Sequence, residues 1–271
     1  GSFQVIVVAE PPPPTDPHDI VAEATGPGGA VVLFNLGNDD GGRPIVCAPP
    51  SGSTFALGAT TVVCGGGISF TVTVVDTTPP VLTLPANMTL HATSPAGAVG
   101  TFTATASDLV DGSVAVVCTP PSGSTFALGT TNVMCSANDA HNNESTGSFQ
   151  IEVIDADPPT IVSLSVSPAT IWPPNKSMIN VTVTANVVDN VDSTPIVRIY
   201  DITCDESIQP GDAVITGPLT AKLRADRDGN GDGRVYTLHI EAIDDAGNRS
   251  ISSINVLVPH DQSGRRRSVR P

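Results

Sequence analysis

The chain has 271 residues, a length that suits two or three domains, with 25 glycines, 25 prolines and only 4% aromatic residues. Its formal net charge of −15 repels nucleic-acid phosphates and anionic membranes, which argues against both as partners. No apolar run approaches the roughly 18 residues of a membrane-spanning helix, so no membrane span is predicted.

The first ten residues, GSFQVIVVAE, match GSFQIEVID at 147–155, the predicted last strand of a module, and are therefore predicted to form a β-strand. Three interpretations stay open: the remnant of an upstream repeat, local packing in the first domain, or donation to a neighbouring chain by strand addition. Donation would make Phe3, Val5 and Val7 an interface. The proline run at 11–14 predicts a semi-rigid linker over residues 11–18.

A long internal repeat follows. Residues 46–64 recur almost unchanged as residues 117–135, and the ten residues Pro49–Gly58 are identical to Pro120–Gly129. Repetition at roughly seventy residues indicates serial modules rather than one large enzyme core. Short alternating segments such as SFTVTVV at 69–75, separated by Gly, Pro, Asn and Asp, predict β-sandwiches.

Each copy of the repeat carries two cysteines at the same spacing. The repetition favours pairing within each copy, Cys47 with Cys64 and Cys118 with Cys135, and disulfides indicate an oxidising, extracellular compartment. The five histidines are scattered along the sequence, which argues against a zinc site built from cysteine and histidine. Cys204 is left over, and a small buried side chain is a simpler interpretation than an intermolecular bridge.

Several motifs in the second copy carry a family resemblance. The segments DTTPPV from Asp76, ASDLVDGSV from Ala106, the Cys118–Cys135 hairpin and GSFQIEVID resemble one complete hyalin repeat (HYR) module. The resemblance implies an immunoglobulin-like β-sandwich of extracellular adhesive and matrix proteins. Residues 19–76 resemble the module less completely, because the hairpin before their last strand is shorter.

The last third, residues 160–258, resembles the bacterial-type immunoglobulin-like domain that often ends such secreted chains, through WPPNK, VDNVDSTP and DAGN. Trp172, the only tryptophan, is expected to anchor its core, with a sugar-stacking platform as the alternative. The fold class is therefore all-β, with tandem immunoglobulin-like β-sandwiches joined by Pro-rich linkers. The predicted divisions are a strand at 1–10, a linker at 11–18, sandwiches at 19–76, 77–157 and 158–258, and a basic tail at 259–271.

Acidic loops are the candidate metal sites. Each is explained by turn chemistry alone, and the alternative is calcium, which prefers oxygen ligands on flexible loops, whereas zinc does not. Linker acids such as Asp76 and Asp155 would join a calcium site at a domain end. The candidate ligands are Asp226, Asp228, Asn230 and Asp232 in one loop, and the pairs Asp108/Asp111 and Asp189/Asp192, accompanied by Asp139 and Asp245.

The sequence contains no catalytic motif, and its paired carboxylates lie on predicted turns. It predicts a non-enzymatic structural or adhesive subunit, secreted or at the cell surface. Head-to-tail contacts through the N-terminal strand and the tail arginines Arg265, Arg266 and Arg267 would build a homopolymeric filament. The alternative is a non-catalytic spacer or glycan-binding region of a secreted enzyme, with a glycan or cell-surface partner.

Overall fold

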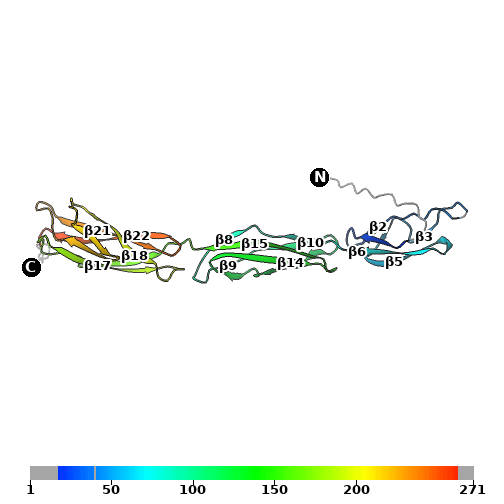
Figure 1. Ribbon diagram of the computed structural model, residues 1–271, viewed down its shortest axis with the longest axis horizontal. Helices are drawn as coiled ribbons and strands as arrows, with labels where there is room; N and C mark the ends of the chain where they lie inside the picture. Colours follow the sequence, from blue (N-terminus) through cyan, green and yellow to red (C-terminus); the bar gives the residue numbers. More distant parts are fainter. Residues whose placement is uncertain (1–17, 40, 262–271) are drawn as a thin grey trace, which may run out of the picture. The chain divides into compact units, whose positions relative to one another are not determined.

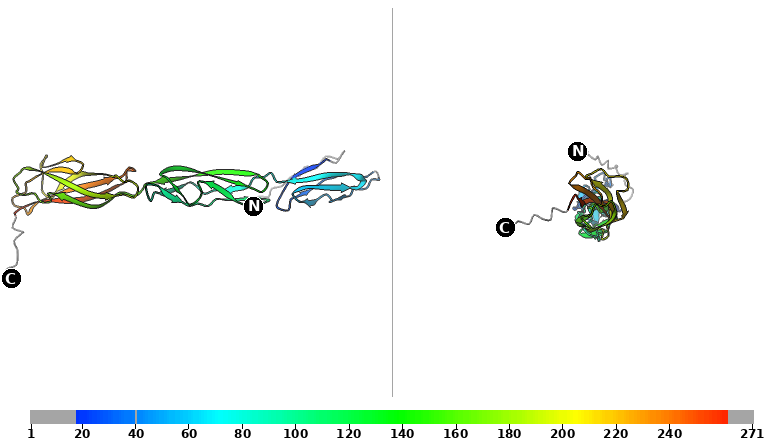
Figure 2. Two further views of the ribbon diagram at one scale, coloured as in Figure 1. Left: turned by 90° about the horizontal axis from the view of Figure 1, so that it is seen from below. Right: turned by 90° about the vertical axis from the view of Figure 1, so that its left-hand side faces the viewer.

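The computed structural model describes residues 18–39 and 41–261, which are rich in β-strand and confirm the all-β prediction. These residues form two compact units. One comprises residues up to Asn87 with Thr101–Ser124 and Asn132–Gln150, and the other comprises Met88–Gly100, Thr125–Thr131 and residues from Ile151 onward. Figure 1 and Figure 2 show their strands from three directions. The predicted interface residues Phe3, Val5 and Val7 and the tail arginines lie outside the described residues.

Residues 19–76 form two sheets. The larger has the order β1-β6-β5-β3, made of β1 (Ile20–Glu23), β6 (Ser69–Val75), β5 (Gly58–Cys64) and β3 (Cys47–Ala48). The smaller pairs β2 (Ala30–Val32) with β4 (Ser53–Phe55), and a 3-10 turn, η1 (Gly65–Gly67), follows β5. Phe70, Val72 and Val74 are at most 5% exposed. The alternating sequence of β6 therefore places one face of the strand in the core.

Residues 77–157 repeat these two sheets and add a third, three-stranded one. One sheet has the order β12-β14-β15-β8, made of β12 (Val116–Thr119), β14 (Gly129–Asn138), β15 (Glu144–Ile154) and β8 (Met88–His91). Another has the order β11-β10-β7, made of β11 (Gly112–Val114), β10 (Thr105–Asp108) and β7 (Val81–Thr83), and β13 (Ser124–Phe126) pairs with β9 (Ala98–Gly100). Strand β8 runs parallel to β15, as β1 does to β6, so the repeated sequence gives a repeated strand arrangement.

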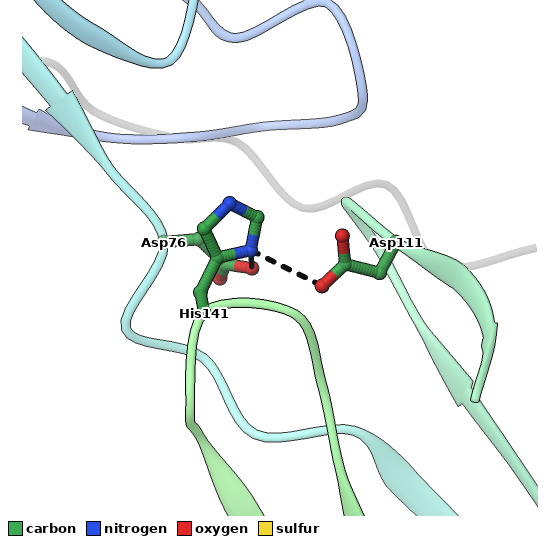
Figure 3. A group of neighbouring side chains, drawn as sticks. All are labelled: Asp76, Asp111 and His141. Atoms are coloured by element: carbon green, nitrogen blue, oxygen red, sulfur yellow. Dashed lines mark hydrogen bonds and ion pairs between the residues drawn. The ribbon is translucent and has the colours of Figure 1, made fainter. Parts of the chain in front are cut away.

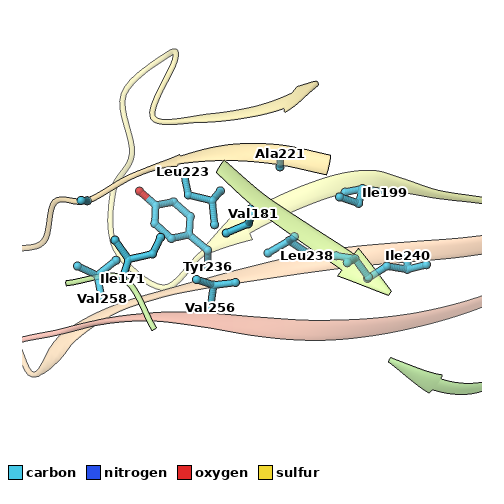
Figure 4. Packing of buried hydrophobic residues seen from close by; sticks show 12 residues of the cluster. Ile171, Val181, Ile199, Ala221, Leu223, Tyr236, Leu238, Ile240, Val256 and Val258 are labelled. Atoms are coloured by element: carbon cyan, nitrogen blue, oxygen red, sulfur yellow. The ribbon is translucent and has the colours of Figure 1, made fainter. Parts of the chain in front are cut away.

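Residues 158–258 form two longer sheets. The first has the order β16-β17-β20-β19, made of β16 (Thr160–Ser167), β17 (Met178–Val188), β20 (Thr220–Arg224) and β19 (Ala213–Gly217). The second has the order β18-β21-β22, made of β18 (Ile196–Cys204), β21 (Gly233–Ile243) and β22 (Arg249–Pro259). Tyr236, Leu238 and Ile240 of β21 are fully buried and pack with Leu223 and Val181 (Figure 4). Burial of each such apolar side chain stabilises the fold by about 1.5–3 kcal/mol.

Trp172 does not anchor this core, so that prediction was wrong. Its neighbour Ile171 is 2% exposed and joins the core cluster, whereas Trp172 is 43% exposed. The backbone N–H of Ile171 donates to the carbonyl of Leu257, which fixes Ile171 against β22. Neighbouring residues in extended backbone point to opposite sides, so Trp172 faces solvent.

Both predicted disulfides are present, Cys47–Cys64 and Cys118–Cys135. The bonded cysteines lie directly opposite each other, on β3 and β5 in the first copy and on β12 and β14 in the second. Cys204 forms no disulfide within the described residues and is half-buried, with its side chain packed against the core of residues 158–258, and its predicted role stays a prediction.

The identical ten-residue segments of the repeat have a structural explanation. Phe55 and Phe126 are both 2% exposed and fill equivalent core positions. Opposite them, the glycines Gly29 and Gly97 lie so close that a Cβ atom would stand 1.8 Å from the carbonyl oxygen of Phe55 or Phe126. Both glycines also have a positive φ, which other residues rarely adopt. Packing therefore accounts for the phenylalanine in each copy and for the glycine opposite it.

No helix among the described residues is long and apolar enough to cross a membrane.

Candidate cation site

The end of β6 places a buried carboxylate at the start of the Pro-rich linker. Asp76 directly follows β6, its side chain is 0% exposed, and its Oδ1 accepts a 3.2 Å hydrogen bond from the backbone N–H of Thr78. Glu23 of β1 anchors the same linker through hydrogen bonds of 2.8–3.0 Å from Thr77 and Thr78. These hydrogen bonds, the one from the Thr77 backbone first, lower the pKa of Glu23. The linker thus leaves the sheet in a defined direction.

The hairpin between β10 and β11 brings two further carboxylates. Asp108 Oδ1 accepts from the backbone N–H groups of Val110 (2.6 Å) and Asp111 (3.0 Å), an arrangement typical of Asp in a turn. At the tip, Val110 is 7% exposed and belongs to the hydrophobic core cluster of residues 19–76. The hairpin is therefore packed against the preceding segment, with its carboxylates at the junction.

The turn between β14 and β15 adds one more carboxylate, that of Asp139, and the imidazole of His141. Asp139 Oδ1 accepts from the backbone N–H groups of His141 and Asn143, both at 2.8 Å, and Oδ2 accepts from Asn143 Nδ2 at 2.8 Å. Asn143 Nδ2 also donates to the carbonyl of Asp76 at 3.1 Å, which ties this turn to the linker. Burial alone would raise the pKa of Asp139, but the hydrogen bonds from Asn143 and His141 outweigh it, and the pKa is lowered.

These residues, which we call the acidic cluster, are Asp76, Asp108, Asp111, Asp139 and His141. One oxygen from each aspartate lies within 4.8 Å of the others. His141 Nδ1 lies 3.1 Å from Asp111 Oδ2 and 3.2 Å from Asp76 Oδ2 (Figure 3). The hydrogen bond with Asp111 contributes most to raising the pKa of His141, although partial burial opposes it. The imidazole of His141 thus lies between two carboxylates of the acidic cluster, those of Asp76 and Asp111.

Two oxygens of the acidic cluster are buried without a hydrogen bond. Asp76 Oδ2 is near His141 but not in hydrogen-bonding geometry, and Asp108 Oδ2 has no hydrogen-bond partner. The two residues are 7% and 9% exposed. Burying a charged oxygen without a partner costs free energy, which a bound cation would offset. Four carboxylates gathered from a linker, a hairpin and a turn suit calcium, which takes six to eight oxygen ligands, including water, in flexible geometry.

A second set of acids repeats the hydrogen-bond pattern but not the cluster. The N–H groups of Val191 and Asp192 donate to Asp189 Oδ1, and Asn248 Nδ2 donates to the carbonyl of Asp155 at 3.1 Å. Burial first, and then the carboxylates of Asp244 and Asp189, raise the pKa of Asp155. Within residues 18–39 and 41–261, however, these acids do not bring three ligand atoms close enough to share an ion.

The Asp226–Gly233 loop also fails to form a cluster. Asp226 Oδ1 and Asp228 Oδ1 accept from nearby backbone N–H groups, those of Arg227 and Asn230. In the part of the chain that the structure describes, Asp226, Asp228 and Asp232 are not grouped as ligands of one ion. The local turn explains this loop, and calcium there stays a prediction.

Sequence reasoning named Asp108 and Asp111 as ligands and Asp76 and Asp139 as neighbours, and the structure brings all four together. It missed His141. The run DAHNN places this histidine two residues after Asp139, but nothing in the sequence indicates that Asp76 and Asp111 lie beside it.

The comparisons with known proteins concern the same region. Residues 75–153 match the family model of the HYR domain. This range contains the whole acidic cluster and the Cys118–Cys135 disulfide, and it confirms the HYR resemblance of the second copy. The resemblances of residues 19–76 and 160–258 stay predictions. No curated protein matches the chain.

Several solved structures resemble the chain at low identity. Protocadherin gamma B2 extracellular cadherin domains 1–5 is 13% identical, with 88% of this chain and 59% of that chain covered and a TM-score of 0.38. Mouse cadherin-23 EC22–24 is 14% identical, with 89% and 95% covered and a TM-score of 0.32. The fibronectin(III)-like modules of Clostridium thermocellum CbhA are 13% identical, with 66% and 94% covered and a TM-score of 0.26. These scores are low, and nothing about function follows from them.

The HYR match, together with the two disulfides, indicates an extracellular adhesion-type module.

Proposed function

We propose that the chain is a non-enzymatic adhesive or structural segment of an extracellular assembly, and that calcium in the acidic cluster stiffens the junction between residues 19–76 and 77–157. The observation that supports this most is the pair of buried oxygens without hydrogen bonds, Asp76 Oδ2 and Asp108 Oδ2. HYR domains are usually non-enzymatic, and a module that provides length and contact surface needs a defined junction.

Calcium would act on the contacts that already join the two segments. Val110 is inserted into the core of residues 19–76, and Asn143 donates to the Asp76 carbonyl. Mutual repulsion of four aspartates opposes both contacts. A divalent cation bound between the carboxylates removes that repulsion, so the junction becomes rigid only when calcium is present.

A calcium titration tests this proposal. Isothermal titration calorimetry on the full chain should give one site with a dissociation constant of about 10⁻⁴ to 10⁻³ M, the range of extracellular modules. Asp108→Asn keeps an oxygen that can accept from Val110 and Asp111 but removes the charge, and should abolish this binding. Asp201→Asn, an exposed residue on β18, is the matched control. Unchanged affinity in Asp108→Asn would refute the site.

We further propose that assembly proceeds head to tail, with residues 3–9 of one chain adding as a strand to another and with Arg265, Arg266 and Arg267 against its acidic surface. Residues 19–76 and 77–157 each already contain their own strand with this sequence pattern, namely β6 and β15. A donated strand would therefore add at a sheet edge, such as β3 or β12. A chain lacking residues 1–10 should fold but not assemble. Filaments formed by the shortened chain would contradict donation.

One observation favours the accessory-region alternative. Trp172 is 43% exposed, so its ring is available to stack on a sugar. Because it is the only tryptophan, its fluorescence reports binding directly. A fluorescence change on titration with soluble polysaccharides, lost in Trp172→Ala, would support glycan binding. No change across a polysaccharide panel would leave the structural function favoured.

A further inference from the structure

We propose that the acidic cluster also binds a transition-metal dication of the zinc class, through His141 Nδ1, Asp76 Oδ2 and Asp111 Oδ2, and that this ion competes with calcium. The inference rests on the same cluster as the proposed calcium site. It adds a nitrogen ligand that the calcium proposal does not use, and it identifies His141 as the residue that sets metal preference.

The spacing of the three atoms fits a small cation. In a tetrahedral zinc site with bonds of about 2.0–2.1 Å, neighbouring ligand atoms lie roughly 3.3–3.4 Å apart. The observed distances from Nδ1 are 3.1 Å to Asp111 Oδ2 and 3.2 Å to Asp76 Oδ2 (Figure 3), and each of the three residues offers a ligand atom within 4.8 Å of the other two. Small movements of these side chains would open the centre to an ion, with water as a further ligand.

The surroundings also suit an ion that enters from solvent. The side chains of His141 and Asp111 are 32% and 20% exposed, whereas that of Asp76 is 0% exposed and carries the oxygen without a hydrogen bond. Asp139 accepts from the backbone N–H of His141, and Asp111 Oδ2 accepts from the N–H of Ala140 at 3.0 Å. Such outer contacts orient metal ligands.

The two ions use overlapping ligand sets. Calcium is a hard cation and would take the four carboxylates, including Asp108 and Asp139, but not the imidazole. Zinc and the other divalent first-row transition metals accept imidazole as a ligand readily, and they bind sites of mixed nitrogen and oxygen ligands more tightly than calcium does. Asp76 and Asp111 belong to both sets, so the two ions exclude each other.

The competing explanation is an ion pair that only joins the hairpin to the linker, because a protonated His141 between two carboxylates would give the same distances. The two explanations differ in one respect: the ion pair requires no metal ligand and predicts no specific zinc or cobalt binding at His141.

The experiment titrates the full chain with Zn²⁺ and, separately, Ca²⁺ by calorimetry, and uses the visible absorption of Co²⁺ to report nitrogen ligation. Circular dichroism verifies that each variant is folded. His141→Gln should weaken Zn²⁺ and Co²⁺ binding at least about tenfold and leave Ca²⁺ affinity within about threefold. Asp108→Asn should do the reverse. Excess Ca²⁺ should reduce the Co²⁺ absorption of the unaltered chain.

Zinc affinity unchanged in His141→Gln, or no specific Zn²⁺ or Co²⁺ binding by the unaltered chain, would overturn the inference and leave the calcium proposal intact. Conversely, zinc binding that depends on His141, in a chain that does not bind calcium, would support the inference while removing the proposed calcium function. The two proposals therefore fail separately.

Discussion

Val110 is a side chain that couples residues 77–157 to the core of residues 19–76. It comes from the β10–β11 hairpin, yet it packs in the core cluster of the preceding segment at 7% exposure. Its neighbours in the sequence, Asp108 and Asp111, carry the carboxylates of the acidic cluster. One hairpin therefore combines an apolar contact with a charged site, which is why a cation there would act on the junction.

Val110→Ala should lower the free energy of unfolding of residues 19–76 by about 1–2 kcal/mol, because it removes buried methyl groups and leaves a small cavity. Urea denaturation monitored by amide signals in β5 and β6 would measure the change. Leu109→Ala is the control, since Leu109 is adjacent but 63% exposed and should change stability little. Equal effects of the two variants would show that Val110 does not stabilise the junction.

Glu241 is a second residue whose charge has a structural role. It is 3% exposed on β21 and accepts from Arg198 on β18 and Arg249 on β22. Burial alone would raise its pKa, but the two guanidinium groups outweigh burial and lower it. Arg249 also lies over the ring of Tyr200 at 4.7 Å, so the network connects three strands of one sheet.

Because the folded-state pKa of Glu241 lies below its ordinary value of 4.5, its contribution to stability is present above that value and is lost as the pH falls through the folded-state pKa. Glu241→Gln should lower the unfolding free energy at neutral pH by about 1–3 kcal/mol. This value already allows for the solvent screening of the two partly exposed arginines. It should also flatten the acid side of the stability profile. Glu152→Gln, exposed on β15, should do neither.

At the scale of elements, the alternating patterns predicted the strands well, because one face of each sheet is buried and the side-chain period is two. Strand β6 and strand β15 follow this rule from end to end. The tandem repeat likewise predicted the disulfide pairs. Trp172 was mispredicted because size and apolar character do not reveal which side of an extended segment a residue faces.

The acidic cluster was only partly predictable. Its members come from the end of β6, the β10–β11 hairpin and the β14–β15 turn, which are far apart in the sequence. Three acidic loops had similar composition, and nothing in their sequence distinguished the one that gathers carboxylates from those that form turns. His141 was missed because a lone histidine carries no signal until Asp76 and Asp111 lie beside it.

The repeated hairpins yield a prediction about covalent structure. Replacing Cys118 and Cys135 with alanine should lower the unfolding free energy by roughly 3 kcal/mol, the chain-entropy value for a loop of this size. Chemical denaturation under non-reducing conditions would measure it. Cys204→Ala is the control, since Cys204 forms no disulfide, and should cost distinctly less. A double variant as stable as the unaltered chain would contradict a stabilising role for the bridge.

At the scale of the whole molecule, the chain combines an extracellular HYR module with two disulfides and a strongly negative net charge. The calcium proposal gives this acidity a function at one junction, while the filament proposal depends on residues 1–10. These proposals are independent, because a calcium-stiffened junction is equally useful in a polymer and in a spacer. Evidence against strand donation would therefore leave the cation site standing.

Hydrogen–deuterium exchange with and without calcium tests the central claim most directly. The backbone amides of Val110, Asp111, Ala140, His141 and Asn143 all donate to carboxylates of the acidic cluster. A calcium-stiffened junction predicts that millimolar calcium slows their exchange in the unaltered chain and has little effect in Asp108→Asn. Exchange at these five amides that is identical with calcium and with chelator would contradict a calcium-stiffened junction.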